Sequence, residues 1–329
     1  MSKLNYIERD SYLFMKSVAI VLSTYNGEKY ISEQLNSLGK QTYPNVSVFI
    51  HDDGSEDRTR ALIESFVRNY TGKIKFCIVD NAKSLKYPAC FIDTLQYIGD
   101  VYDYYAFCDQ DDVWNENKIE NGVMALEKED NKMPLLYYTA VDYYDANLNF
   151  IRHSRFASHV KDSQKLGFQD FLLGGEPLGM TFVFNKKVRN IVVELYEMGY
   201  KSFKDGFIKI LCASTGKIIY DVQPSAKYRR HSEATTGAEN PSNIMLRYYR
   251  EVKRLVTNQE SLDEWRCVLR VIADNYGASI HENDRELFDL FESRITFRTQ
   301  CKKVLWKKRF RNRVIDELGY RLLFLTGKL

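Results

Sequence analysis

Short apolar segments alternate with helix-like segments through the first third of the chain. Residues 17–23 (SVAIVLS) and 104–108 (YYAFC) are apolar almost throughout, which is typical of strands buried on both faces of a sheet. Residues 45–59 (NVSVFIHDDGSEDRT) predict a strand that ends in a polar turn, and residues 73–80 (KIKFCIVD) predict another. Since helical spacing separates these strands, the pattern predicts a parallel sheet with right-handed crossovers.

Small residues mark the ends of the predicted helices. Gly39 is placed to stop a helix whose apolar positions precede it, and Ser55 is placed to cap a helix that begins near Glu56. A short helix over residues 91–98 leads into the strand at 104–108. These signals set the expected lengths of the crossovers.

The pattern loosens after about residue 135. Residues 135–145 and 178–187 still predict strands, and a helix from about Phe203 precedes a strand at Lys217–Tyr220. Beyond Pro241 the chain has a helical pattern, in which one face carries Ile244, Met245, Tyr248, Val252 and Leu255. We therefore expect a first domain over residues 1–238 and a helical region over residues 239–329.

Charge is distributed unevenly along the 329 residues. The segment from Arg294 to Leu329 holds eleven Lys and Arg against two acids, a net charge of +9, so the rest of the chain carries −6 of the total of +3. A basic tail on an acidic body favours an anionic surface as a partner. Nucleic acid is disfavoured, because the basic segment is terminal and the body is net negative.

The cysteine pattern and the hydropathy pattern favour a cytoplasmic protein. Six cysteines are widely spaced with no C-x-x-C pair, which predicts buried, reduced thiols rather than a disulfide framework or a zinc site. The first sixteen residues lack an apolar core of signal-peptide length, and no run of about 18 apolar residues occurs.

Polar clusters follow three of the predicted strands at the point where each strand ends. They are residues 23–27 (STYNG), 52–55 (DDGS) and 109–112 (DQDD). Ligands of open α/β sheets bind outside the carboxyl ends of the strands, so all three clusters are expected at one edge of the sheet. The alternative is that each cluster is a capped turn.

Three carboxylates in four residues, at Asp109, Asp111 and Asp112, suggest that a cation belongs beside them. Mg²⁺ or Mn²⁺ would fit, because these ions take one or two protein carboxylates together with substrate phosphates. Such an ion would stabilise a departing diphosphate. The alternative is a helix N-terminus before Lys118, whose dipole favours acids. Neither a P-loop nor a G-x-G-x-x-G fingerprint is present.

Three motifs in this order, VAIVLSTYNGEKYISEQLNSL, DDGSEDRT and FCDQDDVW, resemble family 2 glycosyltransferases of the GT-A fold. Within that family they resemble bacterial rhamnosyltransferase-like enzymes of polysaccharide assembly, over roughly the first 235 residues. The resemblance implies an α/β fold: a Rossmann-like nucleotide-sugar-binding domain with a mainly parallel central sheet, followed by a C-terminal helical region.

The resemblance also assigns donor-binding roles. Asp53 matches an acid that accepts from the pyrimidine ring, and Asp109 and Asp111 match the D-x-D pair beside ribose and metal, with Asp112 orienting the loop. An acceptor of this kind suits a ring N–H, because buried groups left unpaired are costly. The residues implied in nucleotide-sugar binding are Thr24, Tyr25, Asn26, Asp53, Asp109, Gln110 and Arg229.

The general base of the family matches Asp205. Its carboxylate would deprotonate an acceptor hydroxyl, although Gly206 and Phe207 replace the aromatic residues usual there, which leaves the acceptor type open. A helix-start acid is the alternative. The stretch YRRH ends at His231, which the resemblance implies as a third metal ligand or a diphosphate ligand, with Arg229 or Arg230 pairing with phosphate. A solvated loop histidine is the alternative.

Two stretches differ from, or only weakly match, the family pattern. Residues 84–91 (SLKYPACF) lack the glycine and asparagine of the family's loop after the third strand, so the donor-side loop differs. Glu176 is a weak candidate for the acceptor site, with a simple turn as the alternative.

The basic segment from residue 294 to 314 has apolar residues among its cations: Phe297, Cys301, Val304, Leu305 and Trp306. A basic amphipathic helix with Trp is typical of peripheral binding to the inner face of a membrane. A solvated basic helix, or one that packs on a second copy of the chain in a homo-oligomer, remains an alternative.

The resemblance implies an inverting, metal-dependent glycosyltransferase. The expected donor is a UDP- or dTDP-sugar, with dTDP-rhamnose first from the resemblance, and the expected acceptor is a glycan or a lipid-linked oligosaccharide. The alternatives are a nucleotidyltransferase, for which a Gly-rich phosphate loop is missing, and a non-catalytic sugar-nucleotide-binding scaffold of the same fold.

Overall fold

The computed structural model describes residues 15–79, 84–154, 160, 162–163, 166–173, 178–201, 205–231, 259–310 and 314–325. The predicted helical face between Ile244 and Leu255, and Glu176, lie outside the described residues. Among the described residues, none of the helices is both long enough and apolar enough to cross a membrane.

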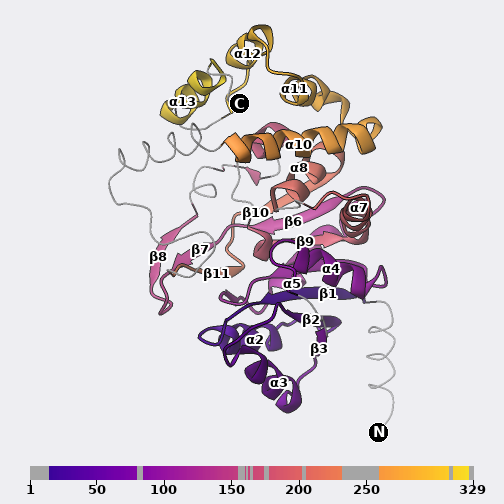
Figure 1. Ribbon diagram of the computed structural model, residues 1–329, viewed down its shortest axis with the longest axis vertical. Helices are drawn as coiled ribbons and strands as arrows, with labels where there is room; N and C mark the ends of the chain where they lie inside the picture. The colour runs from indigo at the N-terminus through magenta and orange to yellow at the C-terminus, as the bar shows by residue number, and fades with distance from the viewer. Residues whose placement is uncertain are drawn as a thin grey trace.

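A seven-stranded sheet forms the centre of the protein, in the order β10-β6-β9-β4-β1-β2-β3 (Figure 1). Only β9 runs antiparallel to its neighbours, so the sheet is mixed but mostly parallel, as predicted. The strands are β1 (Val18–Thr24), β2 (Val46–Asp52), β3 (Lys75–Val79), β4 (Tyr104–Cys108), β6 (Leu135–Thr139), β9 (Val183–Asn185) and β10 (Lys217–Asp221).

Helices cover both faces of the sheet, which is why β1 is apolar on both sides. Val18, Ile20 and Leu22 face a core shared with one set of helices, and Ala19 and Val21 face a second core. The first set is α2 (Ile31–Gly39), α3 (Thr59–Asn69) and α5 (Lys118–Leu126). The second set is α4 (Ala89–Ile98), α7 (Lys186–Glu197) and α8 (Asp205–Thr215).

Some predicted boundaries were wrong. Ser55 does not cap α3, which begins at Thr59; its hydroxyl donates to Asp52 and accepts from the amide of Asn26. The strand predicted over residues 178–187 is the short helix η3 (Gly179–Thr181), then β9, then the start of α7. At these positions side-chain hydroxyl and amide groups form hydrogen bonds with backbone groups. The propensities of single residues do not reveal such hydrogen bonds.

A second sheet, in the order β5-β11-β7-β8, lies beside the carboxyl end of β4. Its strands are β5 (Val113–Trp114), β7 (Asp142–Tyr144), β8 (Phe150–His153) and β11 (Ala226–Arg229). Because β11 pairs antiparallel with β5, the YRRH stretch returns to the turn that contains Asp109 to Asp112.

The C-terminal helices extend the second core beyond α8 (Figure 1). Leu269, Phe288 and Phe324 belong to the same apolar cluster as α7 and α8, so this region shares a core with the sheet. The C-terminal helices are α10 (Gln259–Tyr276), α11 (Glu282–Glu292), α12 (Phe297–Val304) and α13 (Val314–Leu325), with η4 (Gly277–Ser279) after α10. The short helix α6 (Phe168–Leu172), which comes earlier in the chain, packs in the same core. The boundary at residue 238 stays a prediction.

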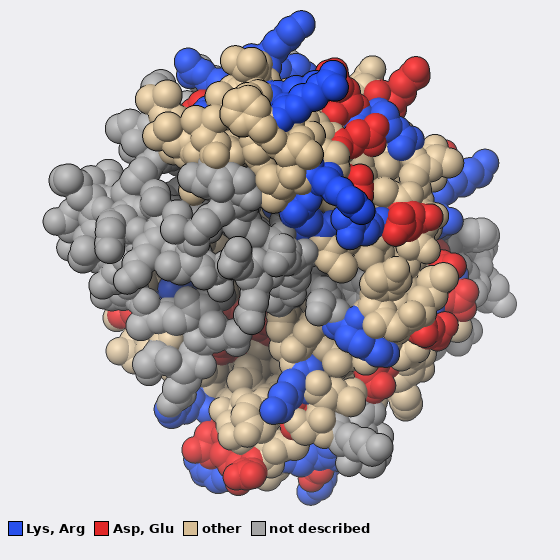
Figure 2. All heavy atoms as spheres, turned by 45° about the horizontal axis from the view of Figure 1, so that its top comes forward, with Lys and Arg blue, Asp and Glu red and all other residues tan. Residues whose placement is uncertain are grey.

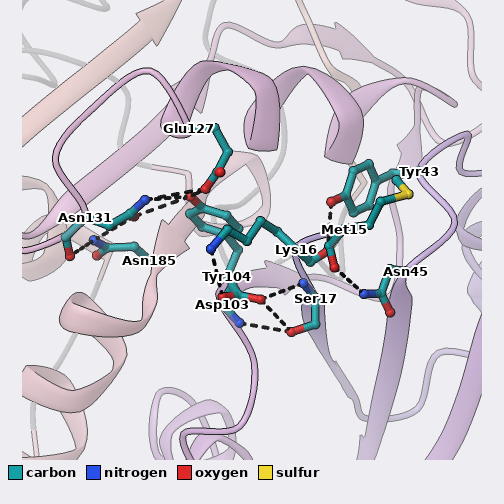
Figure 3. A network of polar contacts seen from close by, with 10 residues as sticks. All are labelled: Met15, Lys16, Ser17, Tyr43, Asn45, Asp103, Tyr104, Glu127, Asn131 and Asn185. Atoms are coloured by element: carbon teal, nitrogen blue, oxygen red, sulfur yellow. Dashed lines mark hydrogen bonds and ion pairs between the residues drawn. The ribbon is translucent and has the colours of Figure 1, made fainter. Parts of the chain in front are cut away.

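A polar network closes the amino ends of β1 and β4 (Figure 3). The Asp103 carboxylate accepts from the Ser17 amide at 2.8 Å, the Ser17 hydroxyl at 3.0 Å and the Lys16 ammonium at 3.4 Å. The hydroxyl of Tyr43 donates to the Lys16 carbonyl at 2.8 Å. This network holds the amino ends of the two strands together. The polar clusters that form the candidate site lie at the opposite, carboxyl ends.

The cysteines are all free, as predicted, but not all are buried. Cys90, Cys108 and Cys212 are buried, whereas Cys77 and Cys267 are exposed. Cys77 lies on the edge strand β3, where alternate side chains face solvent, so burial fails there.

Candidate active site

A cleft of about 630 Å³ opens at the carboxyl ends of β1, β2 and β4. It is lined by residues from all three predicted polar clusters and by Asp205 at the start of α8. The expected gathering of these clusters at one sheet edge is therefore confirmed. Of the predicted site residues, those that line the cleft are Thr24, Tyr25, Asp53, Asp109, Gln110, Asp111, Asp205 and Arg229.

Gln110 joins the turn after β4 to the turn after β1. Its side-chain oxygen accepts from the Tyr25 amide at 2.8 Å, and its side-chain nitrogen donates to the Tyr25 carbonyl at 2.9 Å. A Cβ on Gly27 would stand 2.2 Å from the same side-chain oxygen. The absence of a side chain at Gly27 thus lets the two turns approach, and Tyr25 is held at the cleft.

Asn26 and Thr24 support this turn. Asn26 has a φ of 47°, and its side-chain oxygen accepts from the Glu56 amide at 2.9 Å. Asn26 does not line the cleft, so its side chain supports the turn and does not face a ligand. The Thr24 hydroxyl donates to the Asp52 carboxylate at 3.1 Å, which ties β1 to β2.

Asp53 holds the loop over residues 84–88. Its carboxylate accepts from the amides of Leu85 at 2.6 Å and Lys86 at 2.9 Å, and from the Ser84 hydroxyl at 3.1 Å. Burial acts to raise the pKa of this carboxyl, but the hydrogen bonds from Leu85, His51 and Lys86 together leave the pKa below its usual value. Asp53 therefore stays ionised and anchors the donor-side loop that differs from the family pattern.

The acids after β4 lie close enough together for their negative charges to repel one another. Burial in the cleft, followed by the charges of Asp111 and Asp205, raises the pKa of Asp109 to about 8. Burial and the charges of Asp111 and Asp109 likewise raise the pKa of Asp112 well above its ordinary value, although the Arg229 amide donates to it at 3.0 Å. A cation bound here would offset both the cost of burying the ionised carboxylates and the repulsion between them.

Arg229 stabilises the acidic turn from behind. Its side chain is 2% exposed, donates to the carbonyls of Asp111 at 2.7 Å and Ala146 at 2.6 Å, and pairs with Glu33. The guanidinium also lies over the Tyr30 ring, 4.6 Å from its centroid. Its donors are directed at protein oxygens rather than at a phosphate, so the structure favours a positioning role for Arg229 over the predicted one.

His231 lies directly against Asp111. Its Nε2 is 2.8 Å from an Asp111 carboxylate oxygen, and its ring packs on Tyr30 at a centroid distance of 4.7 Å. Among the described residues, Nδ1 of His231 and Oδ2 of Asp112 are buried without a hydrogen-bond partner. The solvated-loop alternative for His231 does not describe this position.

The residues at this end of the cleft fit a divalent cation in type. Carboxylate oxygens suit Mg²⁺ and Mn²⁺, and an imidazole is a further donor to Mn²⁺. Asp109, Asp111 and His231 supply these donors, and burial together with the charges of Asp111 and Asp205 raises the pKa of Asp109. Within the described ranges, however, no three such side chains already surround one point, so the ion or its substrate would have to draw them together.

Asp205 stands at the N-terminus of α8 and faces the cleft. Its carboxylate accepts from the Gly179 amide at 2.8 Å and from the Tyr87 hydroxyl at 3.4 Å. Burial raises its pKa to about 6, against the lowering effect of these two hydrogen bonds. A carboxyl that changes charge near neutral pH is suited to proton transfer.

Sequence reasoning missed Tyr87 and Gly179. A Cβ on Gly179 would stand 2.5 Å from Oδ1 of Asp205, so the glycine is what admits the carboxylate to η3. Tyr87 belongs to the loop whose sequence departs from the family pattern. That departure was the feature of the sequence that could have drawn attention to Tyr87. Nothing in the sequence indicated that residues 118 positions apart would meet.

Comparison with known proteins identifies the family of the chain. Residues 19–191, more than half of the chain, match the model of glycosyl transferase family 2. The chain belongs to this family. It is therefore a glycosyltransferase, which transfers a sugar from a nucleotide sugar, and the predicted reaction class is confirmed.

Individual relatives are distant. The chain is 27% identical over 265 residues to the dTDP-rhamnosyl transferase RfbG of Shigella flexneri, covering 77% of this chain and 85% of that protein. It is 26% identical over 225 residues to an uncharacterised glycosyltransferase of Rickettsia typhi, covering 67% of this chain and 65% of that protein.

Solved structures confirm the fold. The structure of Staphylococcus aureus TarS 1–349 in complex with UDP-GlcNAc superposes with a TM-score of 0.56 at 16% identity, covering 95% of this chain and 82% of that one. The complex of the same TarS fragment with UDP gives a TM-score of 0.52 at 17% identity, covering 89% and 75%. The predicted GT-A-like fold, with a mostly parallel sheet and a helical C-terminal region, is thus confirmed.

Proposed function

We propose that the protein is an inverting, metal-dependent glycosyltransferase whose general base is Asp205. The observation that carries this proposal is that Asp205, with a pKa of about 6, lines the same cleft as Asp109 and Asp111. One acid is suited to accept a proton, and the other cluster is suited to hold a cation beside a diphosphate.

The donor in this proposal is a pyrimidine nucleoside-diphosphate sugar, with dTDP-rhamnose tested first. A relative that covers most of this chain is named a dTDP-rhamnosyl transferase, and the superposed TarS structures carry UDP or UDP-GlcNAc. Asp53 is less suited than predicted to read the base, because its oxygens already accept from loop 84–88. We assign base contact to Tyr25 and Thr24, and a supporting role to Asp53.

The transfer step needs one base and one leaving group. Asp205 takes the proton of an acceptor hydroxyl as that oxygen forms a bond to the anomeric carbon. The bond from that carbon to the diphosphate oxygen breaks on the opposite face, and its electron pair leaves with the nucleoside diphosphate. Asp109, Asp111 and His231 would hold a divalent ion, which when bound supplies charge stabilisation to the leaving diphosphate.

The acceptor in this proposal is a hydroxyl of a glycan or a lipid-linked oligosaccharide, in line with a relative that is named a dTDP-rhamnosyl transferase. Asp205 lines the same cleft of about 630 Å³ as Asp109 and Asp111, where this hydroxyl would meet the donor. Homo-oligomerisation and a cytoplasmic location stay predictions.

Donor binding is tested first, by thermal denaturation with UDP, dTDP, GDP and ADP, each with and without Mg²⁺ or Mn²⁺. Ligands that bind only the folded chain raise the Tm, by an amount set by concentration over Kd. We expect a metal-dependent rise with one pyrimidine diphosphate, lost in Asp111→Ala. Equal shifts with all four nucleotides, or none, would contradict the donor assignment.

Turnover is tested by release of the nucleoside diphosphate from its rhamnose donor in the presence of acceptor glycan. Asp205→Asn is expected to lower kcat by roughly 10²- to 10⁴-fold while leaving the donor-induced Tm shift intact. Asp170→Asn is the matched control, since Asp170 is an acid in the first turn of α6 and lies outside the cleft. Donor binding with no turnover in the native chain would favour the scaffold alternative.

A further inference from the structure

The last part of the chain exposes large apolar side chains. Phe297 at the start of α12 is 85% exposed, and Leu305 just after the helix is 78% exposed. On α13, Leu318, Leu322 and Leu325 are 58%, 64% and 56% exposed. Their spacing puts the three leucines on one face of the helix, so α13 presents an apolar stripe outward.

Exposed cations accompany these apolar residues. We call the surface formed by the exposed residues of α12 and its flanks the C-terminal basic surface; it comprises Arg294, Ile295, Phe297, Arg298, Lys302, Leu305, Lys307, Lys308 and Arg309. Among the described side chains from residue 294 to 325, the one acid is Glu317, which is 6% exposed. The surface is therefore positive as well as apolar.

The space-filling view agrees with this distribution. In Figure 2 blue side chains border a tan surface at the upper end of the molecule, where α12 and α13 lie in Figure 1. Red side chains gather to one side of it. The neighbouring α11 carries the acids Glu282, Asp284, Glu286, Asp289 and Glu292, so the chain changes from acidic to basic between the end of that helix and Arg294.

The shape of the C-terminal basic surface is fixed by buried contacts. Arg321 on α13 pairs with Glu317 at 2.6 Å and donates to the carbonyls of Trp306 at 2.8 Å and Lys308 at 2.9 Å. Phe310 packs against Phe291 with ring centroids 5.6 Å apart. These contacts hold the segment after α12 in place. Its exposed cations and apolar side chains are therefore already positioned, and the segment does not have to fold before it binds.

We propose that the C-terminal basic surface docks on an anionic lipid bilayer. A bilayer accepts Phe and Leu side chains below its headgroups while Lys and Arg pair with lipid phosphates. Nucleic acid would satisfy the cations but leave Phe297 and Leu305 in water. A second copy of the chain on a two-fold axis would bring the same cations face to face.

This docking does not rest on the proposed transfer reaction, but it would deepen it. A transferase held at a membrane reaches acceptors that are carried on lipids, which is the acceptor class proposed above. The two proposals fail separately, because vesicle binding is measured without donor, acceptor or metal.

The test is co-sedimentation of the full chain with vesicles of phosphatidylglycerol and phosphatidylcholine, and with vesicles of phosphatidylcholine alone. We expect binding to the anionic vesicles that weakens as salt rises, because exposed charges are screened. Lys302→Gln/Lys307→Gln/Lys308→Gln should weaken binding by about tenfold or more. Phe297→Ser/Leu305→Ser should weaken it comparably at the same net charge.

The matched control is Arg68→Gln/Lys73→Gln/Lys75→Gln. These cations are exposed on α3, its following loop and β3, at the opposite end of Figure 1, and their removal changes net charge equally. The control should bind vesicles as the native chain does. Equal loss in both triple variants, or no binding of the native chain to anionic vesicles, overturns the proposal. So does a dimer that Leu305→Ser dissociates while vesicle binding stays unchanged.

Discussion

The hydroxyl of Tyr87 donates to Oδ1 of Asp205 across the cleft, at 3.4 Å. Tyr87 belongs to the loop that Asp53 holds by its backbone amides, and Asp205 begins α8. The contact therefore connects the loop over residues 84–88 with the proposed general base. Because a hydrogen bond to a carboxylate favours its ionised form, Tyr87 lowers the pKa of Asp205 against the effect of burial.

Tyr87→Phe should move the pH dependence of transfer. Without the hydroxyl, the pKa of Asp205 rises above its value of about 6, so a smaller fraction is ionised at any pH below neutrality. The acid limb of kcat/KM should shift to higher pH, with a loss of roughly 2- to 10-fold on that limb and a smaller loss at pH 8. Tyr97→Phe, at an exposed tyrosine of α4, is the control. Superimposable profiles for Tyr87→Phe and the native enzyme would exclude this role.

Gly179→Ala should displace the proposed base. The new Cβ would stand 2.5 Å from Oδ1 of Asp205, and the carboxylate would have to move away from the Gly179 amide that it accepts from. We expect kcat to fall by roughly 10²-fold, since a displacement of about 1 Å is costly to a positioned catalytic group. Gly206→Ala is the matched control, because no atom beyond its chain neighbours and the backbone of its own helix lies within 4 Å of the added Cβ. Equal activities of the two alanine variants would contradict the placement of Asp205.

Asp53→Asn should destabilise the fold near neutral pH. An amide cannot accept at both positions, so at least one of the Leu85 and Lys86 amides loses its partner, at a cost of about 1–3 kcal/mol in the free energy of unfolding. Asp52→Asn is milder, because the Asp52 oxygen accepts from hydroxyls that an amide oxygen can also serve. Urea denaturation at pH 7 measures the difference.

The same variant has a defined pH signature. The folded pKa of Asp53 is lowered, so its stabilisation is complete above the unfolded pKa of about 3.9 and is lost as pH falls through the lower folded value. The gap in unfolding free energy between native chain and Asp53→Asn should therefore narrow below about pH 4. A gap that is constant from pH 7 to pH 3 would show that the ionised carboxylate is not what holds the loop.

Mg²⁺ should bind more tightly as pH rises. Asp109 has a pKa of about 8, so near neutral pH a proton competes with the ion for this carboxylate. Titration calorimetry at pH 6.5 and pH 8.5 should show a roughly tenfold gain in affinity at the higher pH. Asp109→Asn should bind weakly and without this pH dependence. Equal affinities of the native chain at both pH values would remove Asp109 from the metal site.

The sequence by itself determined the alternation of strands and helices as far as β4 and the edge of the sheet that would carry the site. The β-branched run of β1 predicts burial on both faces, which a parallel sheet covered by helices provides. Since parallel strands point their carboxyl ends the same way, Tyr25, Asp53 and Asp109 had to share one edge. The family motifs then gave Asp205 a role before any contact was visible.

Tertiary structure decided what each of those side chains faces. Arg229 appeared in the sequence as a free cation for phosphate, yet its guanidinium is buried against carbonyls and Glu33. Asp53 appeared as a base-reading acid, yet it accepts from a loop more than 30 residues away. Hydrogen-bond partners are set by distances between segments that only packing brings together. Residue type and spacing indicated most of the groups that reach the cleft. Long-range contacts brought Tyr87 and Gly179 there, left Asn26 outside, and determined which groups are left available to a ligand.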